Sequence, residues 1–510
     1  MAIFTGARSF ATFDSEELRL LLGALDPEYH IPGVDKIVDS ILPRCYVRVK
    51  DEAYQRIAKC PFLNVSIDES TDIRNRRVLN ISVSDSTRSY FIGLRDLAGE
   101  ATTAENLAEW VISELRDLAC GDFSRINSIT TDTCSTMHSL WRILASRQET
   151  KDVFFLGSDS HGLQLLIKDI ISLPSVSKVF KSAQAIVAHF NNAPMQLAIL
   201  RYFQLREYKE ERALLGSIIT RWGTQYLMLQ SIKDNEIALT KYVREHECRD
   251  EIKVVLRSMD FWDTVSQILY ILKPIHEAIK ASESVASHAG YVLQRWFDAM
   301  RHLEACSMSK EFGDDLTHYM ASKFHDRMRR QVQDLHWAAY YLNPLRTTDT
   351  MPGTLQALLQ FSQFRNSTGE FFEAKSWSFK ERPQHFWEVQ KSMAGASSEL
   401  AGLALRLFHT TTTSTASERA FSAQNRQLTL SRNRMTTAHT DMATFIYLNA
   451  RSLRETPEID DNNVGLVQED NLMSSWGQMP RILEDQEQLE NEAACRQVSL
   501  AAQAYLPAKA

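Results

Sequence analysis

Between residues 62 and 97 the sequence has three short β-prone stretches in a row, and this feature restricts the possible fold most strongly. They lie at 62–68, 77–85 and 88–97, with only brief polar turns between them. In 77–85, apolar and polar side chains alternate, which is the period of a strand with one buried face. Strands joined by such short turns predict an antiparallel meander.

The chain then alternates between helical and strand-like segments. Helices are expected at 102–120, 134–147 and 161–173, and strands at 125–132 and 152–157. Three strands followed by helix, strand, helix, strand and helix are typical of a mixed α/β sheet of the ribonuclease-H type. We therefore expect an α/β fold of this type.

Helical periodicity dominates the rest of the chain. The predicted organisation is a helical lead-in, the first part of the ribonuclease-H-like domain, a large all-helical insertion, the C-terminal part of the core, and an acidic flexible tail, at 1–60, 61–175, 176–398, 399–454 and 455–510. The lead-in has a cap-like Asp14-Ser15 and an interruption at Pro43. Within the insertion, Pro274 is expected to kink or split the helix at 261–280.

Composition excludes several protein classes. A chain of 510 residues with 44% hydrophobic and 24% charged residues is typical of a globular protein with a sizeable core. The sequence has no apolar run long enough to span a bilayer and no signal-peptide pattern at its start, so we expect no membrane partner and a cytosolic or nuclear location. Its seven cysteines include no C-x-x-C pair, which argues against a zinc finger or a disulfide scaffold.

Charge is distributed unevenly along the chain. The net charge is −7, but residues 455–510 alone hold eleven acidic and three basic residues, or −8. The preceding 454 residues therefore sum to about +1. An acidic tail on a near-neutral body is compatible with local basic surfaces and a nucleic-acid partner.

Two acidic residues follow predicted strands that should be neighbours. Asp68 ends the first strand and Asp132 ends the fourth, and in a ribonuclease-H-like sheet these strands are parallel and adjacent. Two carboxylates held close together stay ionised only if a cation lies between them, and hard oxygen ligands suit Mg²⁺ or Mn²⁺. From position alone, however, an Asp at a strand end is more often a turn or cap residue.

A third carboxylate is usually needed to hold a second ion. Two such ions can activate a water or a sugar hydroxyl on one side of a phosphodiester and stabilise the leaving oxygen on the other. Glu418 is the candidate because it opens a helix directly behind the polar loop at 411–415, which can reach back to the edge of the sheet.

Six stretches then carry a resemblance to a known family. They are 67-IDESTDIRNRRVLNISV-83, 128-SITTDTCSTM-137, 160-SHGLQLLIKDI-170, 220-TRWGTQYLMLQSI-232, 338-AAYYLNP-344, and 412-TTSTASERAFS-422 with 432-RNRMTTAHTDMATFIYLN-449. In this order they resemble the first and second catalytic motifs, the His-bearing motif, the Arg-Trp motif, the helical insertion and the C-terminal dimerisation region of hAT-superfamily transposases, the group of hobo and Activator.

The resemblance implies a cut-and-paste DNA transposase core. Asp68, Asp132 and Glu418 would be its metal-binding catalytic triad, with two Mg²⁺ or Mn²⁺ ions. It also implies that Trp222 stacks on a base at the cleaved DNA end with Arg221 beside it, and that His161 supports the site. Such an enzyme works in the nucleus on transposon ends and target DNA, in DNA transposition and recombination.

Other interpretations of the same residues stay open. Trp222 fits a core tryptophan, and His161, at the start of a predicted helix, fits a capping or core role. The chain has no Cys/His set for the zinc finger with which family members usually begin, so the resemblance is to the core without that finger.

The alternative functions follow from these departures. The first is a catalytically inactive, transposase-derived dimer that binds DNA or protein, and the second is a host nuclease of the ribonuclease-H type. A homodimer or higher homo-oligomer is expected from the apolar residues between Met435 and Ile446 and from the family likeness. That apolar face can equally pack within its own chain.

Overall fold

The structure is a computed structural model that divides into two compact units. It describes residues 2–6, 10, 15–28, 30–71, 76–85, 87–97, 103–217, 223–284, 287–308, 312–346, 364, 366–367, 375–393, 398–427 and 435–454. The first unit lies within 1–158, 283–291 and 333–510, and the second within 159–282 and 292–332. Each unit is described by itself. The predicted acidic tail at 455–510 lies outside the described residues.

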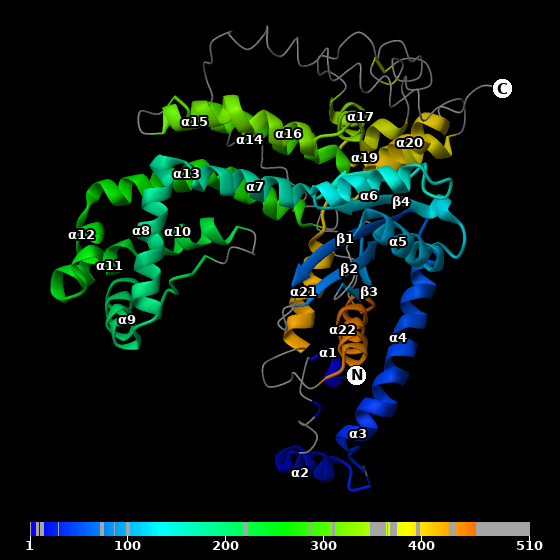
Figure 1. Cartoon of the computed structure of the whole chain (residues 1–510), viewed down its shortest axis with the longest axis horizontal. Coiled ribbons are helices and arrows are strands. Elements are labelled where there is room, and N and C mark those ends of the chain that lie inside the picture. Colours follow the sequence, from blue (N-terminus) through cyan, green and yellow to red (C-terminus); the bar gives the residue numbers. More distant parts are fainter. Residues whose placement is uncertain are drawn as a thin grey trace. The chain divides into compact units, whose positions relative to one another are not determined.

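The first unit is built on a five-stranded mixed sheet (Figure 1). Its strands are β1 (Leu63–Thr71), β2 (Arg77–Ser84), β3 (Ser89–Asp96), β4 (Ile126–Thr131) and β5 (Phe154–Gly157), in the spatial order β3-β2-β1-β4-β5. Strands β1, β2 and β3 form the predicted antiparallel meander, whereas β4 pairs in parallel with both β1 and β5. The α/β class and the parallel pairing of the first and fourth strands are thus confirmed, and the order is compatible with the ribonuclease-H type.

The first unit also contains α-helices, several of which pack against the sheet. They are α1 (Ala2–Thr5), α2 (Glu16–Leu25), α3 (Val34–Lys36), α4 (Leu42–Ile57), α5 (Ala104–Ala119), α6 (Ser135–Ala145), α17 (Asp334–Tyr341), α19 (Pro383–Ser392), α20 (Ser398–Phe408), α21 (Thr415–Gln427) and α22 (Thr437–Ser452). Alternate residues of β1, namely Leu63, Val65 and Ile67, are buried in one hydrophobic core with side chains of α4, α5, α6 and α22. Burial of this apolar surface is the main term that stabilises the sheet.

The lead-in helix changes its form just before Pro43. A π-helical turn at Ile37–Ile41 joins α3 to α4, and Pro43 lies in the first turn of α4. Since proline has no backbone N–H, it is tolerated at such a helix start. The predicted interruption is therefore a change of helical pitch rather than a break.

The apolar face of α22 is buried against its own chain. Phe445 and Ile446 are 2% and 0% exposed. The Phe445 ring packs edge-on against Tyr46 of α4 and Phe91 of β3, with ring centroids 5.0 and 6.2 Å apart. Phe445 and Ile446 thus pack within the chain, which is the alternative that the sequence left open.

Asn449 of α22 holds the backbone of the edge strand β3. Its Oδ1 accepts from the Phe91 N–H at 2.9 Å, and its Nδ2 donates to the Phe91 carbonyl at 2.8 Å. Asn449→Ala should lower the free energy of unfolding by about 2–4 kcal/mol, because both buried backbone groups lose their partner. Urea unfolding measures the change, with the half-buried His439→Ala on the same helix as control. A loss no larger than that of the control would contradict this role.

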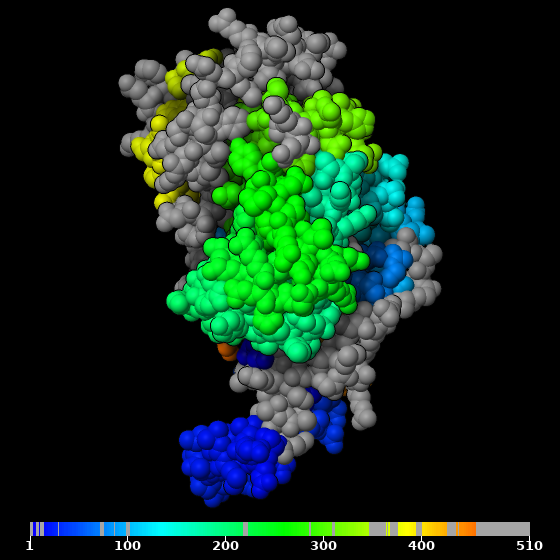
Figure 2. Space-filling model, turned by 90° about the vertical axis from the view of Figure 1, so that its left-hand side faces the viewer, coloured from blue at the N-terminus to red at the C-terminus, as the bar shows by residue number. Residues whose placement is uncertain are grey.

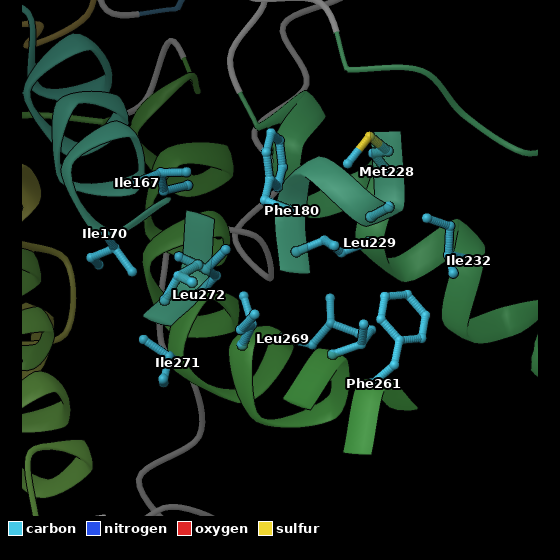
Figure 3. Packing of buried hydrophobic residues seen from close by; sticks show 14 of the residues in the cluster. Ile167, Ile170, Phe180, Met228, Leu229, Ile232, Phe261, Leu269, Ile271 and Leu272 are labelled. Atoms are coloured by element: carbon cyan, nitrogen blue, oxygen red, sulfur yellow. The ribbon is translucent and has the colours of Figure 1, made fainter. Parts of the chain in front are cut away.

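The second unit is helical in all of its described regular elements. Its helices are α7 (Asp159–Ile171), α8 (Pro174–Asn191), α9 (Pro194–Tyr208), α10 (Thr224–Asp234), α11 (Glu236–Glu245), α12 (Asp250–Arg257), α13 (Met259–Ser282), α14 (Val292–Cys306), α15 (Gly313–Tyr319) and α16 (His325–Gln331). Figure 3 shows side chains of α7, α8, α10 and α13 in its core, among them Ile167, Phe180, Leu229 and Leu272. The predicted limits of the insertion, 176–398, stay a prediction.

Pro274 does not split α13, which runs unbroken for 24 residues. A proline inside a helix leaves the carbonyl four residues earlier without its usual donor. That carbonyl belongs to Tyr270, and the Nε2 of His302 on α14 lies 3.1 Å from it. The His302 ring thus replaces the missing backbone donor, which explains why the helix continues.

None of the described helices is both long and apolar enough to cross a membrane.

Candidate metal-binding carboxylate site

The two aspartates lie at matching positions on neighbouring parallel strands. Ser66 of β1 is paired with Thr130 of β4, and Asp68 and Asp132 each follow two residues later. Asp68 is still within β1, while Asp132 comes directly after the end of β4. Since parallel strands run in the same direction, both carboxylates reach the same edge of the sheet. This is the arrangement that the sequence predicted for these two residues.

Polar side chains of the strands bind the threonine-rich loop that precedes Glu418. The amide of Asn64 donates to the carbonyl of His409 at 2.7 Å, and that of Asn127 donates to Thr410 Oγ1 at 3.0 Å. The hydroxyl of Thr130 donates to the carbonyl of Thr411 at 3.1 Å. Every one of these bonds joins a strand to a loop more than 270 residues away in the sequence.

Further contacts of the same loop are made by hydroxyl groups. Ser84 Oγ lies 3.2 Å from Thr411 Oγ1, and Ser414 donates to Ser158 Oγ through both its backbone N–H and its hydroxyl. All four side chains are buried. Buried polar groups cost free energy unless they are bonded, so this network holds the loop in one position on the sheet.

The last contacts of the network fix the residue next to Glu418. Asn80 lies directly opposite Asp68 in the β1–β2 register, and its Nδ2 donates to the carbonyl of Ser417 at 2.7 Å. Ser66 Oγ lies 3.1 Å from Ser417 Oγ. Strands β1 and β2 thus hold Ser417 from two sides, and α21 packs along both strands (Figure 1). Glu418 is consequently held beside Asp68.

The charge of Asp68 interacts with Glu418, and that of Asp132 with Asp68. Burial and the charge of Asp132 raise the pKa of Asp68 to about 7. Burial, the charge of Asp68 and the charge of Glu283 raise the pKa of Glu418 to about 10. The Oε1 atom of Glu418 is buried and has no hydrogen-bond partner among the residues that the structure describes. Burial and like charges both penalise the ionised form, so without a cation Glu418 holds its proton at neutral pH.

The carboxylates do not yet form a set of metal ligands. Among the residues that the structure describes, no three His, Cys, Asp or Glu side chains are grouped so that they could hold a metal ion. Asp68, Asp132 and Glu418 are therefore neighbours whose charges interact, and metal binding requires their oxygens to converge further. Their chemistry fits such a cation, because all three offer hard oxygen ligands and one buried Glu418 oxygen is unpaired.

The raised pKa values predict how stability depends on pH in metal-free protein. The folded state keeps the Asp68 proton up to about pH 7, whereas the unfolded chain loses it near pH 4. The folded state binds more protons in this range, so the free energy of unfolding should fall as pH rises from 4 to 7. Relative to Asp68→Asn, the wild-type protein should lose roughly 3 kcal/mol.

Urea unfolding across this pH range measures the loss, and added Mn²⁺ provides the control. The ion should restore stability at pH 7 and above, where it can replace the protons, and have little effect near pH 4. The same pH dependence in wild type and Asp68→Asn would contradict the interpretation.

The structure does not test the roles of the other predicted site residues, His161, Arg221 and Trp222. His161 is the third residue of α7 and is half-buried, and it belongs to the second unit, whereas the carboxylates belong to the first. Arg221 and Trp222 lie outside the described residues. The described chain resumes at Gly223, where a left-handed φ of 69° precedes α10. The DNA-binding roles of these three residues stay predictions.

Sequence reasoning missed the side chains that position Glu418. Asn64 and Ser66 alternate with buried apolar residues on β1, as Asn80 and Ser82 do on β2. Such alternation is the usual pattern of a strand with one face in water. Here the polar face is buried under the loop and α21, and all four residues are at most 6% exposed. The one available signal was the excess of Asn and Ser over charged residues on that face. The sequence analysis also missed Glu283, whose charge helps to raise the pKa of Glu418.

Comparison with known families adds an independent result. Residues 32–186, which include β1 to β5 and both aspartates, match a family described as a domain of unknown function (DUF659). Residues 369–450 match the hAT family C-terminal dimerisation region, which contains Glu418. The chain is a hAT-type, transposase-like protein. A search of curated proteins found no match to it.

The two matches have direct consequences for the hAT-type protein. They confirm the family that the six sequence motifs resembled. The match to a dimerisation region also supports homo-oligomerisation. Since the apolar face of α22 is used within its own chain, that match does not identify the side chains of the contact.

Proposed function

We propose that this hAT-type protein is the core of a metal-dependent DNA transposase that cleaves and joins DNA strands with Asp68, Asp132 and Glu418. The observation that carries the proposal is the hydrogen-bond network that fixes Ser417 on β1 and β2, because it brings Glu418 beside Asp68 across 350 residues of sequence. If the loop merely covered the surface of the sheet, nothing would require an acidic side chain with a buried oxygen at Glu418.

In this proposal the sheet is of the ribonuclease-H type and residues 176–398 form its helical insertion. Two bound Mg²⁺ or Mn²⁺ ions would supply activation of a water or a 3′ hydroxyl and stabilisation of the leaving oxygen. Asp68, Asp132 and Glu418 would hold these ions through their carboxylate oxygens. Burial around Glu418 excludes bulk water and strengthens the electrostatic interactions at the site.

DNA would be the substrate and partner. Trp222 would stack on a base at the cleaved end, with Arg221 beside it and His161 supporting the site. An enzyme acting on chromosomal DNA would work in the nucleus, as a homodimer or higher homo-oligomer.

A second candidate is a catalytically inactive, transposase-derived protein that dimerises and binds DNA or protein. One observation favours it, namely that no three-ligand metal group occurs among the described residues.

Incubation of the full chain with a DNA hairpin substrate separates the two candidates. The transposase proposal predicts strand cleavage in Mn²⁺ that is lost with a chelator, whereas folded protein that binds the hairpin without cleaving it supports the second candidate.

A further inference from the structure

A buried hydrogen bond joins two predicted DNA-binding segments within the second unit. Gln164 of α7 accepts from the backbone N–H of Gly223 through its Oε1 atom, at 2.8 Å. Gln164 comes three residues after His161, so the two are neighbours on the surface of one helix. Gly223 directly follows Arg221 and Trp222, which lie outside the described residues. The bond therefore ties the residue next to the predicted Arg-Trp pair to the part of α7 that carries the predicted histidine.

His276 of α13 packs closely against the same glycine. Gly223 has a left-handed φ of 69°, and a Cβ atom at this position would lie 2.7 Å from Nδ1 of His276. Glycine fits here because it has no Cβ. The ring of His276 stacks on Tyr226 of α10, with ring centroids 4.4 Å apart, and is thereby fixed itself. Gly223 is thus held both by a hydrogen bond and by a close steric contact.

Helix α10, which begins after Gly223, is held in place by other contacts. Its residues Met228, Leu229 and Ile232 are at most 1% exposed in the core of the second unit, where α10 packs on α8 and α13. Figure 3 shows these three side chains in that core, and Figure 2 shows the outer surface of the same part of the chain in green. Burial of three large apolar side chains stabilises the helix more than one hydrogen bond at its start. The bond from Gly223 to Gln164 therefore acts mainly on the turn before α10.

We propose that Gln164 and His276 are positioning residues for DNA, which hold Gly223 and thereby fix where Trp222 meets an unpaired base. Consecutive Cα atoms are about 3.8 Å apart, so whatever holds Gly223 also restricts the positions open to the residue before it. An aromatic ring that is already positioned loses less conformational freedom when a base stacks on it. The inference rests on the proposed DNA-binding role of Trp222, but not on metal binding or strand cleavage.

The test measures base stacking by the full chain in the absence of metal. The probe is a DNA hairpin with an unpaired 2-aminopurine at its tip, a fluorescent base that is quenched when it stacks on an aromatic ring, and EDTA prevents cleavage. At saturating protein, wild type should quench the probe and Trp222→Ala should not. Gln164→Ala removes the bond to the Gly223 N–H, and Gly223→Ala forces the turn away from His276. Each should reduce the stacked fraction about fivefold or more.

Gln225→Ala is the matched control. The Oε1 atom of Gln225 accepts from Nε2 of Gln164 at 3.1 Å, so its loss disturbs the same buried cluster but leaves the bond to Gly223 in place. This variant should quench the probe within about twofold of wild type. Circular dichroism shows whether each variant is folded, and if Gln164→Ala or Gly223→Ala does not fold, the other decides.

Three results would overturn the inference. Quenching by folded Gln164→Ala or Gly223→Ala equal to that of wild type would show that the held glycine does not position Trp222. An equal loss in Gln225→Ala would show that the cluster serves only the stability of the unit. Wild type that does not quench the probe, or Trp222→Ala that quenches it fully, would remove the base contact itself. In contrast, wild type that quenches the probe but does not cleave DNA in Mn²⁺ would contradict the proposed chemistry and support this inference.

Discussion

Glu418→Gln should reduce Mn²⁺-dependent DNA cleavage by at least about 1,000-fold while the protein stays folded. The substitution keeps the shape of the side chain but removes the negative charge that the second cation needs, and loss of a group that stabilises the transition state typically costs this much. Because burial and the charges of Asp68 and Glu283 keep the Glu418 carboxyl protonated in the metal-free folded state, the wild type loses stability at neutral pH, where the unfolded chain ionises, and a neutral amide does not. We therefore expect the melting temperature of the metal-free variant to equal or exceed that of wild type.

The matched control is Glu69→Gln. Glu69 is the next residue after Asp68, but its side chain is paired with Arg77 at 2.6 Å rather than with the other carboxylates. Its neutralisation should leave the cleavage rate within about threefold of wild type. Initial rates on a labelled hairpin measure both variants. Equal losses in the two variants would show that general charge, and not the position of Glu418, determines the rate.

Asn80→Ala should lower the cleavage rate by about 100-fold, the typical cost of displacing a catalytic group by about 1 Å. Asn80 is fully buried and does not need to contact DNA or metal to have this effect. Its amide bonds the carbonyl of Ser417, so its loss leaves that buried carbonyl unpaired and frees the start of α21. The free energy of unfolding should fall by about 1–3 kcal/mol.

Ser82→Ala provides the comparison for this positioning role. Ser82 lies two residues along the same strand, is equally buried, and among the described residues donates to Asn80, at 3.5 Å. Its loss should change cleavage less than about threefold, since no bond to the loop is removed. Raising the Mn²⁺ concentration should partly restore Asn80→Ala and have no effect on Glu418→Gln. An Asn80→Ala enzyme with a normal rate and reduced stability would show that the bond is structural only.

The strands and their order could be predicted because their signals are local. The alternation in 77–85 and the short turns after it define the antiparallel meander, and the parallel pairing of β4 follows from the helix α5 between the strands. Chain direction places Asp68 and Asp132 at the same ends of their strands, and the register that aligns them is set by the pairing of β1 with β4. These features depend on sequence period, which a single sequence contains.

The parts that could not be predicted depend on contacts between distant residues. Asn80 meets Ser417 only after the chain has folded, 337 residues later, and nothing near either residue indicates the partner. The face of α22 between Met435 and Ile446 has the same period whether it packs on its own chain or on a second copy.

The measurement that tests the central claim most directly is an anomalous-scattering map from crystals of the full chain grown with Mn²⁺. The account predicts two manganese peaks about 4 Å apart, with Asp68 between them and with Asp132 and Glu418 each contacting one. Fully occupied Mn²⁺ bound elsewhere, or a Glu418 carboxyl that stays protonated and away from any ion, would contradict it.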